Sequence, residues 1–399
     1  MSILVDRSRI ETDWACARKR YWLTEYTDDL DGPVHPARPI GIVPSTPSPA
    51  LAFGLAVHEG LEYQILEYTR GSHSGLSPLR SRWVPSQENR CPPEEAGLYM
   101  MKGHGNPLSE QAKVWDTLTP DQQDTAQALI IGFFKTIWPR WMEQYEPMAV
   151  EQELEMEVDG VIFMMRPDLL LKDKQTGDIW YPDFKTFTSW NNRKWDWGLQ
   201  QQLTMLACEK ALGVTLTGAW IQGLSKGSGR KGVLYHPLVY GYRHPGTPGV
   251  TDPTFGSKRR SGFERFHTWD YPYGGIEGWI DRLADKDPEL LSKCYPQTAP
   301  LFLKKELMEE EIVPQVVARE KQIEALRLIH GATPDEHRKR FPMNINQCET
   351  GYGRCSYFEA CHVPAVHRHP LKGGGYKPRH PHHKAEQDIH ELLSGAEPG

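Results

Sequence analysis

The sequence predicts an α/β fold in which a mixed central sheet is flanked by helices. Three short apolar runs, at residues 161–166, 169–171 and 179–181, are separated by turn-forming residues and are typical of paired strands. Apolar residues recur at helical spacing over residues 53–68, and a second helical pattern over residues 199–212 stops at a glycine. Helices before and after a group of strands are typical of this fold class.

Each remaining segment is assigned from its own pattern. Residues 1–26 are expected to be helical, and residues 108–145 have a helical pattern that predicts an insertion packed on the core. Residues 151–159 alternate apolar and acidic side chains, which predicts a half-buried strand with glutamates facing solvent. A further metal ligand among these glutamates is the alternative. Residues 214–224 predict another strand, with residues 235–242 as its partner.

The chain divides into five parts on this basis. They are an N-terminal helix (1–26), a loop with a helix and the helical insertion (27–150), the core (151–339), a cysteine cluster (340–362) and a His-rich tail (363–399). Residues 301–330, within the core, are expected to form one or two amphipathic helices. The tail combines His, Gly and Pro without regular spacing, so we expect it to be disordered.

The composition is that of a soluble, cytoplasmic protein with a substantial core. Of 399 residues, 39% are hydrophobic and 13 are tryptophans, yet no apolar stretch approaches the roughly 18 to 20 residues of a membrane span. The first ten residues lack the apolar region of a secretory signal. A formal charge of -6 argues against a protein that coats DNA with a uniformly basic surface, but a local basic groove remains compatible with it.

Two acidic residues and a lysine form the first chemical motif. Asp168 follows Arg166 and Pro167, and Asp183 and Lys185 follow fifteen and seventeen residues later. Carboxylate oxygens suit Mg²⁺ or Mn²⁺. Alternate side chains of a strand share a face, so Asp183 and Lys185 are expected to point the same way, with an ammonium beside the ion. Solvated strands also alternate acids and bases, so the triplet alone carries little weight.

The wider arrangement resembles the PD-(D/E)xK nuclease superfamily, including the literal proline before Asp168. Gly54 and His58 match the Gly-x-x-x-His element of its RecB-like branch, and Gln202 lies on the following helix where that branch has a DNA-binding glutamine. Two positions depart from the branch: Met165 stands where it has a glycine, and Leu206 where it has a tyrosine.

The resemblance implies a restriction-endonuclease-like core and hydrolysis of DNA phosphodiesters. His58, Asp168, Asp183 and the backbone carbonyl of Phe184 would hold Mg²⁺ or Mn²⁺, and Lys185 would position or activate water. A lone histidine on an apolar helix face can also be a hydrogen-bonded core residue. Exonuclease rather than endonuclease activity rests on family analogy alone.

Four of the seven cysteines form the second motif. Cys348, Cys355 and Cys361 lie within fourteen residues, and Cys16 lies near the start of the chain. This distribution resembles the iron-sulfur nucleases of the same branch, among them AddB and the CRISPR-associated exonucleases, in which a cluster clamps the two ends of the chain. The resemblance implies a structural cluster of the 4Fe-4S type on these four thiolates. Zinc and unliganded thiols remain alternatives. Cys91, Cys208 and Cys294 are given no role.

Several features are expected to contact nucleic acid. The basic candidates are Lys226, Arg230 and Lys231, and Trp190, Trp195 and Trp197 could stack unpaired bases, which favours DNA with a free or single-stranded end. The chain has no Walker P-loop, so unwinding would need a separate helicase or recombinase. The expected setting is DNA repair, recombination or phage DNA metabolism. A non-catalytic DNA-binding scaffold with the same fold and an RNA-processing nuclease are the alternatives.

Overall fold

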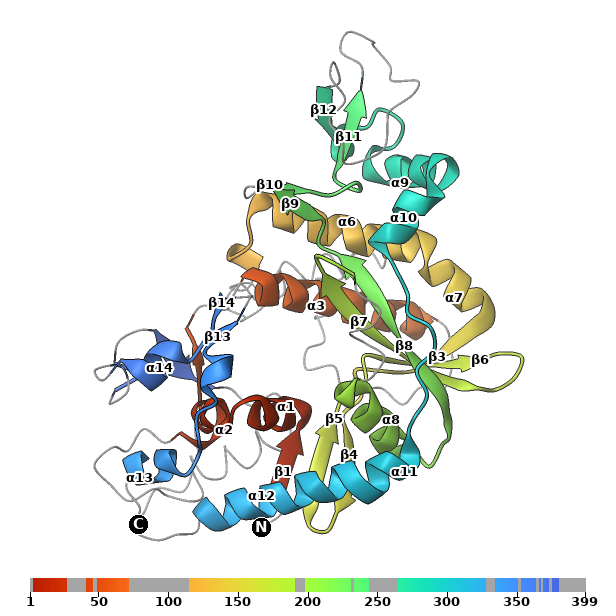
Figure 1. The fold of residues 1–399 in the computed structure, drawn as a ribbon. Coiled ribbons are helices and arrows are strands. Elements are labelled where there is room, and N and C mark those ends of the chain that lie inside the picture. Colours follow the sequence, from red (N-terminus) through yellow and green to blue (C-terminus); the bar gives the residue numbers. More distant parts are fainter. Residues whose placement is uncertain are drawn as a thin grey trace, which may run out of the picture.

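Figure 1 shows the fold of the protein in a computed structural model. The structure describes residues 3–26, 41–45, 49–71, 115–190, 198–230, 233–243, 264–327, 334–350, 353–363, 366, 369–372 and 375–379. Several residues singled out above lie outside the described residues, namely Cys91, Trp195, Trp197, Lys231 and most of the His-rich tail.

A four-stranded mixed sheet forms the centre of the fold, in agreement with the predicted class. Its strands, in spatial order, are β3 (Tyr145–Val150), β6 (Leu169–Asp173), β7 (Ile179–Phe187) and β8 (Leu216–Ser225). The pairs β3·β6 and β6·β7 are antiparallel, whereas β7·β8 is parallel and is connected through the helix α8 (Leu199–Leu212). Gly213, in the left-handed conformation (φ 65°), ends α8, as the sequence predicted.

A second, three-stranded sheet takes up the other predicted strands. The hairpin of β4 (Leu154–Val158) and β5 (Val161–Met165) turns at Asp159 and Gly160, both with positive φ, and β5 also pairs in parallel with β1 (Ile3–Asp6). The prediction that residues 1–26 are helical is therefore wrong for residues 3–6. The apolar side chains of Ile3, Leu4 and Val5 favour a strand once β5 offers an edge with which to pair.

Helices cover both faces of the four-stranded sheet (Figure 1). On one face lie α3 (Pro49–Gly71), α6 (Pro120–Thr136) and α7 (Trp138–Gln144), whose apolar side chains share a core with Leu169, Leu171 and Phe184. On the other face α8 packs against Leu170 and Tyr181. The alternation of Leu169, Leu170 and Leu171 between two cores is what a strand buried on both faces requires.

The remaining elements extend from this centre. After β8 the chain forms the hairpins β9 (Ser228–Arg230) with β10 (Val233–Tyr235) and β11 (Tyr240–Arg243) with β12 (Glu264–His267), and then α9 (Gly275–Lys286) and α10 (Pro288–Cys294). The single strand predicted over 235–242 is thus replaced by parts of two hairpins, and neither is hydrogen-bonded to β8. The helix α12 (Val313–Arg327) falls within the predicted helical region 301–330.

The two ends of the chain pack together (Figure 1). After α1 (Arg7–Ala15), the segments α2 (Ala17–Arg20) and η1 (Tyr21–Glu25) carry Tyr21 and Trp22 into a core with Phe341 and Tyr357. Buried ion pairs add to this contact: Arg20 binds Glu320 on α12 at 2.9 Å, and Arg327 donates to Glu25. Joining the ends therefore depends on buried apolar and ionic contacts of residues far apart in sequence.

Part of the C-terminal tail is a strand, contrary to the prediction that all of it is disordered. β15 (Tyr376–Pro378) pairs antiparallel with β2 (Ile42–Pro44), and the Tyr376 ring stacks on Tyr357. Arg379 reaches Asp6 at 3.5 Å. An aromatic and a basic side chain with buried partners thus anchor a stretch whose composition alone favours disorder. Within the described part of the chain, no helix is long and apolar enough to cross a membrane.

Candidate metal centre

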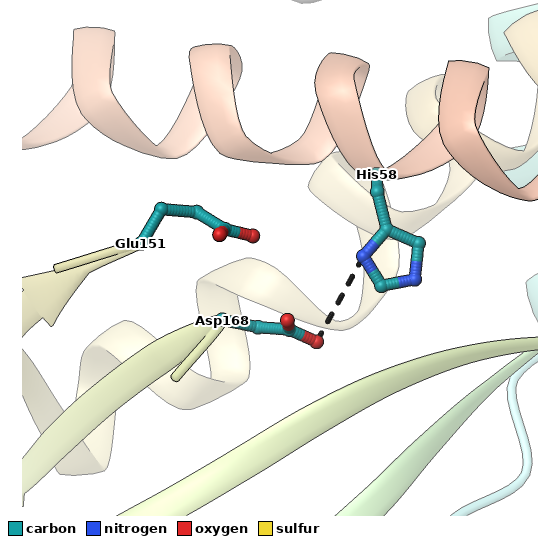
Figure 2. Close-up of side chains that lie close together, drawn as sticks. All are labelled: His58, Glu151 and Asp168. Carbon is teal, nitrogen blue, oxygen red and sulfur yellow. Dashed lines mark ion pairs between the residues drawn. The ribbon is translucent and has the colours of Figure 1, made fainter. Parts of the chain in front are cut away.

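Three side chains from separate segments converge at one end of the central sheet (Figure 2). His58 projects from α3, Glu151 directly follows β3, and Asp168 directly precedes β6. One ligand atom of each lies within 4.8 Å of those of the other two, and Nδ1 of His58 is 3.9 Å from Oδ2 of Asp168. An imidazole and two carboxylates at this spacing can hold a divalent cation.

The backbone around the centre explains this convergence. The hydrogen-bonded register of β6 and β7 covers only residues 171–172 and 179–180. Nearer the centre, the Phe184 N–H donates instead to the carboxylate of Asp168 at 2.7 Å. Glu151 has a positive φ of 46°, and its N–H donates to the carbonyl of Asp168 at 3.2 Å. The hydrogen-bonded pairing of β6 with β7 therefore stops before the centre. Asp168 lies beyond the last paired residues, where its carboxylate and its carbonyl accept from Phe184 and Glu151 instead.

Gly54 allows α3 to lie close to β7. A methyl group at this position would meet the Thr186 hydroxyl oxygen at 3.3 Å, which is a tight contact. Thr186 directly follows Lys185, so the glycine brings the helix that carries His58 against the part of β7 that carries the lysine. The Gly-x-x-x-His spacing, which resembles an element of the RecB-like nucleases, therefore also has a steric explanation.

Burial sets the charge states at the centre. It lowers the pKa of His58, an effect opposed by the Asp168 carboxylate, so the imidazole is neutral near pH 7 and can donate a lone pair to a cation. Burial also raises the pKa of Glu151 well above its usual range, and the charge of Asp168 adds to this shift. The guanidinium of Arg166, with Nε 2.8 Å from Glu151 Oε2, acts in the opposite direction.

A line of polar side chains on β7 lies next to the centre. Tyr181, Asp183 and Lys185 share one face of the strand, as the sequence predicted for the last two, whereas Phe184 is buried on the opposite face. Asp183 is fully buried and accepts four hydrogen bonds. The donors are Tyr181 Oη (3.0 Å), Lys185 Nζ (2.8 Å), Gln200 Nε2 (3.1 Å) and Gln201 Nε2 (2.8 Å). Asp183 lies outside the group of His58, Glu151 and Asp168.

The predicted DNA-binding residues are placed differently from one another. Gln202 is buried, with its amide bonded to the Phe302 carbonyl and the Lys304 N–H, so the structure does not bring it to the centre. Successive helix positions point about 100° apart, and it is Gln200 and Gln201 that face Asp183. Lys226 donates to the Ala50 carbonyl at the start of α3, at 2.8 Å. The side chains of Arg230 and Lys231 are outside the described residues.

Several residues at or next to the centre, Gln200 among them, were not assigned from the sequence. Glu151 belongs to the acidic alternation of residues 151–159, for which a solvated face is the favoured interpretation and a metal ligand the alternative. The structure leaves only 10% of its side chain exposed, beside Asp168. One feature of the sequence could have indicated Glu151 as a metal ligand: it is an acid between the end of one strand and the start of the next. Tyr181 and Gln201 gave no signal, because their role depends on which residues face Asp183 after folding.

The four cysteines expected to hold a cluster lie in the contact between the chain ends. Two of their sulfurs accept hydrogen bonds from nitrogen: the Trp22 indole donates to Cys361 at 3.3 Å, and the Asn344 N–H donates to Cys16 at 3.4 Å. Burial raises the pKa of Cys361, while the Trp22 hydrogen bond and Arg18 lower it. Burial and the charges of Cys355 and Cys16 raise the pKa of Cys348. Cys16 and Cys355 are thus near enough to Cys348 and to Cys361 to influence the charge of both thiols.

The other described cysteines differ in their surroundings. Cys208 and Cys294 are buried in apolar cores, and burial raises the pKa of each thiol to about 12. They are inert, hydrophobic thiols.

No family model matches the chain, and a search of curated proteins found no match either.

Proposed function

We propose that the protein is a metal-dependent nuclease of the PD-(D/E)xK type that hydrolyses phosphodiester bonds in DNA. The observation that carries the proposal is the convergence of His58, Glu151 and Asp168 near the lysine of the Asp-x-Lys motif, whose charge acts on His58. A neutral imidazole and two acids next to an ammonium are the groups needed to hold a hard cation and to act on a phosphate beside it.

His58, Glu151 and Asp168 would hold the ion, and the family resemblance adds Asp183 and the backbone carbonyl of Phe184. When bound, Mg²⁺ or Mn²⁺ supplies Lewis-acid chemistry at the phosphate. The N–H of Phe184 and the backbone of Glu151 hold Asp168 in place. Arg166 fixes the orientation of the Glu151 carboxylate.

Lys185 acts on the attacking water. Its ammonium, held by Asp183, donates a hydrogen bond that orients the water toward phosphorus and offsets the negative charge that grows on the phosphate. The new bond joins the water oxygen to phosphorus, and the water gives up one proton to solvent. The bond to the leaving sugar oxygen breaks, and that oxygen takes up a proton from solvent. Tyr181 and Gln201 keep the Asp183 carboxylate from rotating, so the lysine is positioned before substrate arrives.

The proposal includes a structural iron-sulfur cluster, of the 4Fe-4S type, on Cys16, Cys348, Cys355 and Cys361. Support comes from the contact between the chain ends and from the N–H donors to Cys16 and Cys361, since thiolate ligands of clusters commonly accept such hydrogen bonds. Exonuclease activity and a helicase or recombinase partner are proposed by family analogy.

The nuclease proposal is tested with end-labelled single- and double-stranded DNA and a matched RNA. The anaerobically purified protein is incubated with Mn²⁺, and the controls are Lys185→Ala and EDTA. Cleavage of DNA that both controls abolish supports the proposal, and a ladder from one end gives the polarity. Cleavage of RNA alone would make it an RNA-processing nuclease. Intact nucleic acid together with tight DNA binding would favour a non-catalytic scaffold.

The cluster is tested separately through iron and zinc content. Cys355→Ala is expected to lose iron and the brown absorbance and to unfold at a lower temperature, because metal binding and folding are coupled. Cys294→Ala, which removes a buried thiol far from the chain ends in sequence, is the matched control and should keep its iron. Zinc in the wild type in place of iron would contradict this part of the proposal.

A further inference from the structure

Two leucines on α3 are exposed on the same side of the helix as His58. Leu51 has 56% of its surface exposed and Leu55 47%. Positions 51, 55 and 58 recur at helical spacing, and between them Ala52, Phe53 and Val57 are buried against the sheet. The first turns of this face are therefore apolar, and the following turn carries the histidine of the candidate metal centre.

The apolar turns border the proposed reaction site. Gly54, between the two leucines, lies against Thr186, the residue after Lys185. With a helical rise of about 1.5 Å per residue, Leu55 lies about 4.5 Å and Leu51 about 10.5 Å along the axis from His58. Consecutive nucleotides of one strand are about 3.4 Å apart when stacked and farther apart when unstacked, so these distances span the one to three nucleotides next to a phosphate at the centre.

Charged residues on and beside this helix favour one direction of approach for a nucleic-acid strand. Beyond His58, the next turn carries Glu59 and Glu62, which contribute to the negative field around Glu151. At the N-terminal end of α3, on the side of the buried Phe53 ring rather than on the leucine face itself, the ammonium of Lys226 lies at the Ala50 carbonyl. A phosphodiester backbone is repelled by the glutamates and attracted by the lysine, so a strand entering the centre favours the leucine side.

We infer that Leu51 and Leu55 form a base-contacting surface for the nucleic-acid strand whose phosphate lies at the metal centre. This inference rests on the proposed function and names the part of the substrate recognised there, the apolar faces of unstacked bases. Aliphatic side chains offer a base face no hydrogen bond, so this contact carries no sequence preference. Leu55 contacts the nucleotide nearest the centre, and Leu51 contacts bases farther along the strand.

The experiment compares two oligonucleotides with the same backbone, one with normal bases and one with abasic sites at its last three positions. The wild type is expected to cleave the normal strand about tenfold faster, which is at the lower end of the effect of stacking a base on an aromatic side chain, since contacts to aliphatic side chains are weaker. The double variant Leu51→Ser with Leu55→Ser should cleave both strands at the slower rate. Leu55→Ser alone should lose part of the preference. Tyr273→Ser, at an exposed aromatic residue of another segment, should keep all of it.

Binding of the same strands to Lys185→Ala with Ca²⁺ separates the inference from the proposed function. If the wild type cleaves neither strand, but Lys185→Ala binds the normal strand more tightly and loses this preference when Leu51 and Leu55 are both replaced by serine, the nuclease proposal fails and the surface stands. Equal cleavage and binding of both strands by the wild type, or a preference that persists in the double variant, would overturn the inference. Matching thermal unfolding of all variants shows that they fold.

Discussion

The Lys185 ammonium lies 2.8 Å from Oδ1 of Asp183, because both side chains project from the same face of β7. The same carboxylate also accepts from Tyr181 and from two glutamines of α8. A fully buried acid with this number of donors is held in one orientation. The lysine at its edge is therefore fixed as well, while 21% of its own side-chain surface stays open to solvent and substrate.

Replacing this lysine should remove catalysis and leave metal binding intact. Lys185→Met is expected to slow Mn²⁺-dependent DNA cleavage by about 10² to 10⁴-fold, the usual contribution of a positioned acid or base. Its affinity for Mn²⁺ should be equal to or higher than that of the wild type, since a positive charge has been removed. Cleavage rates and Mn²⁺ titrations check both parts. Lys172→Met, at a half-exposed lysine of β6, is the control, and equal rates for both variants would contradict the role of Lys185.

The acid missed from the sequence should control the pH dependence of metal binding. Because burial and then Asp168 raise the pKa of Glu151, this residue must lose a proton before a cation can bind, and wild-type affinity should rise with pH through this range. Glu151→Gln is expected to bind Mn²⁺ about tenfold more weakly above that pKa, which corresponds to about 1.4 kcal/mol. It should also lose most of the pH dependence.

Titration of Mn²⁺ by electron paramagnetic resonance at several pH values measures this. Glu155→Gln, on the exposed face of β4, provides a control that should behave as the wild type. If Glu151→Gln keeps the wild-type pH profile, another group takes up the proton and Glu151 is no ligand.

Local patterns predicted much of the sheet and part of the centre. The apolar runs predicted β5, β6 and β7. The period-two alternation of a strand correctly predicted that Asp183 and Lys185 lie on one face. Pairing between distant segments could not be predicted, because no local pattern records that β1 joins β5 or that β15 joins β2.

The same limit explains the errors at the site. Gln200, Gln201 and Gln202 are chemically identical neighbours, and only the packed orientation of α8 decides which of them reach Asp183. Glu151 shared its acidic alternation with glutamates that do face solvent. Its burial depends on the backbone turn after β3 and on contact with Asp168, neither of which a strand pattern contains.

The indole of Trp22 should tune the proposed cluster rather than hold it. Trp22→Phe removes the N–H that donates to Cys361 and retains most of the apolar contacts between the chain ends. Fewer hydrogen bonds to a thiolate ligand favour the oxidised, less negative cluster, so the reduction potential should fall while iron content stays the same. Redox titration followed by visible absorbance measures the shift. An unchanged potential in a fully loaded variant would mean that this hydrogen bond does not act on a cluster.

A buried histidine away from the site should make the fold sensitive to acid. His236 is fully buried, its Nδ1 accepts from the Leu238 N–H at 3.2 Å, and burial lowers its pKa to about 4. The unfolded chain binds a proton near pH 6.5, whereas the folded protein does so only near pH 4. The stabilising effect of the neutral ring is therefore complete above pH 6.5 and is lost as the pH falls to 4, by about 3 kcal/mol.

His236→Asn tests this, because its side-chain oxygen can accept the Leu238 N–H but does not titrate in this range. The free energy of unfolding is measured by urea denaturation at pH 7 and at pH 4.5 for both proteins. Other acid-sensitive groups, such as Glu25 between Arg327 and Arg20, affect both proteins equally and cancel in the difference. Wild-type stability should fall by more than that of the variant, and a difference between the two that is the same at both pH values would show that His236 is not the titrating group.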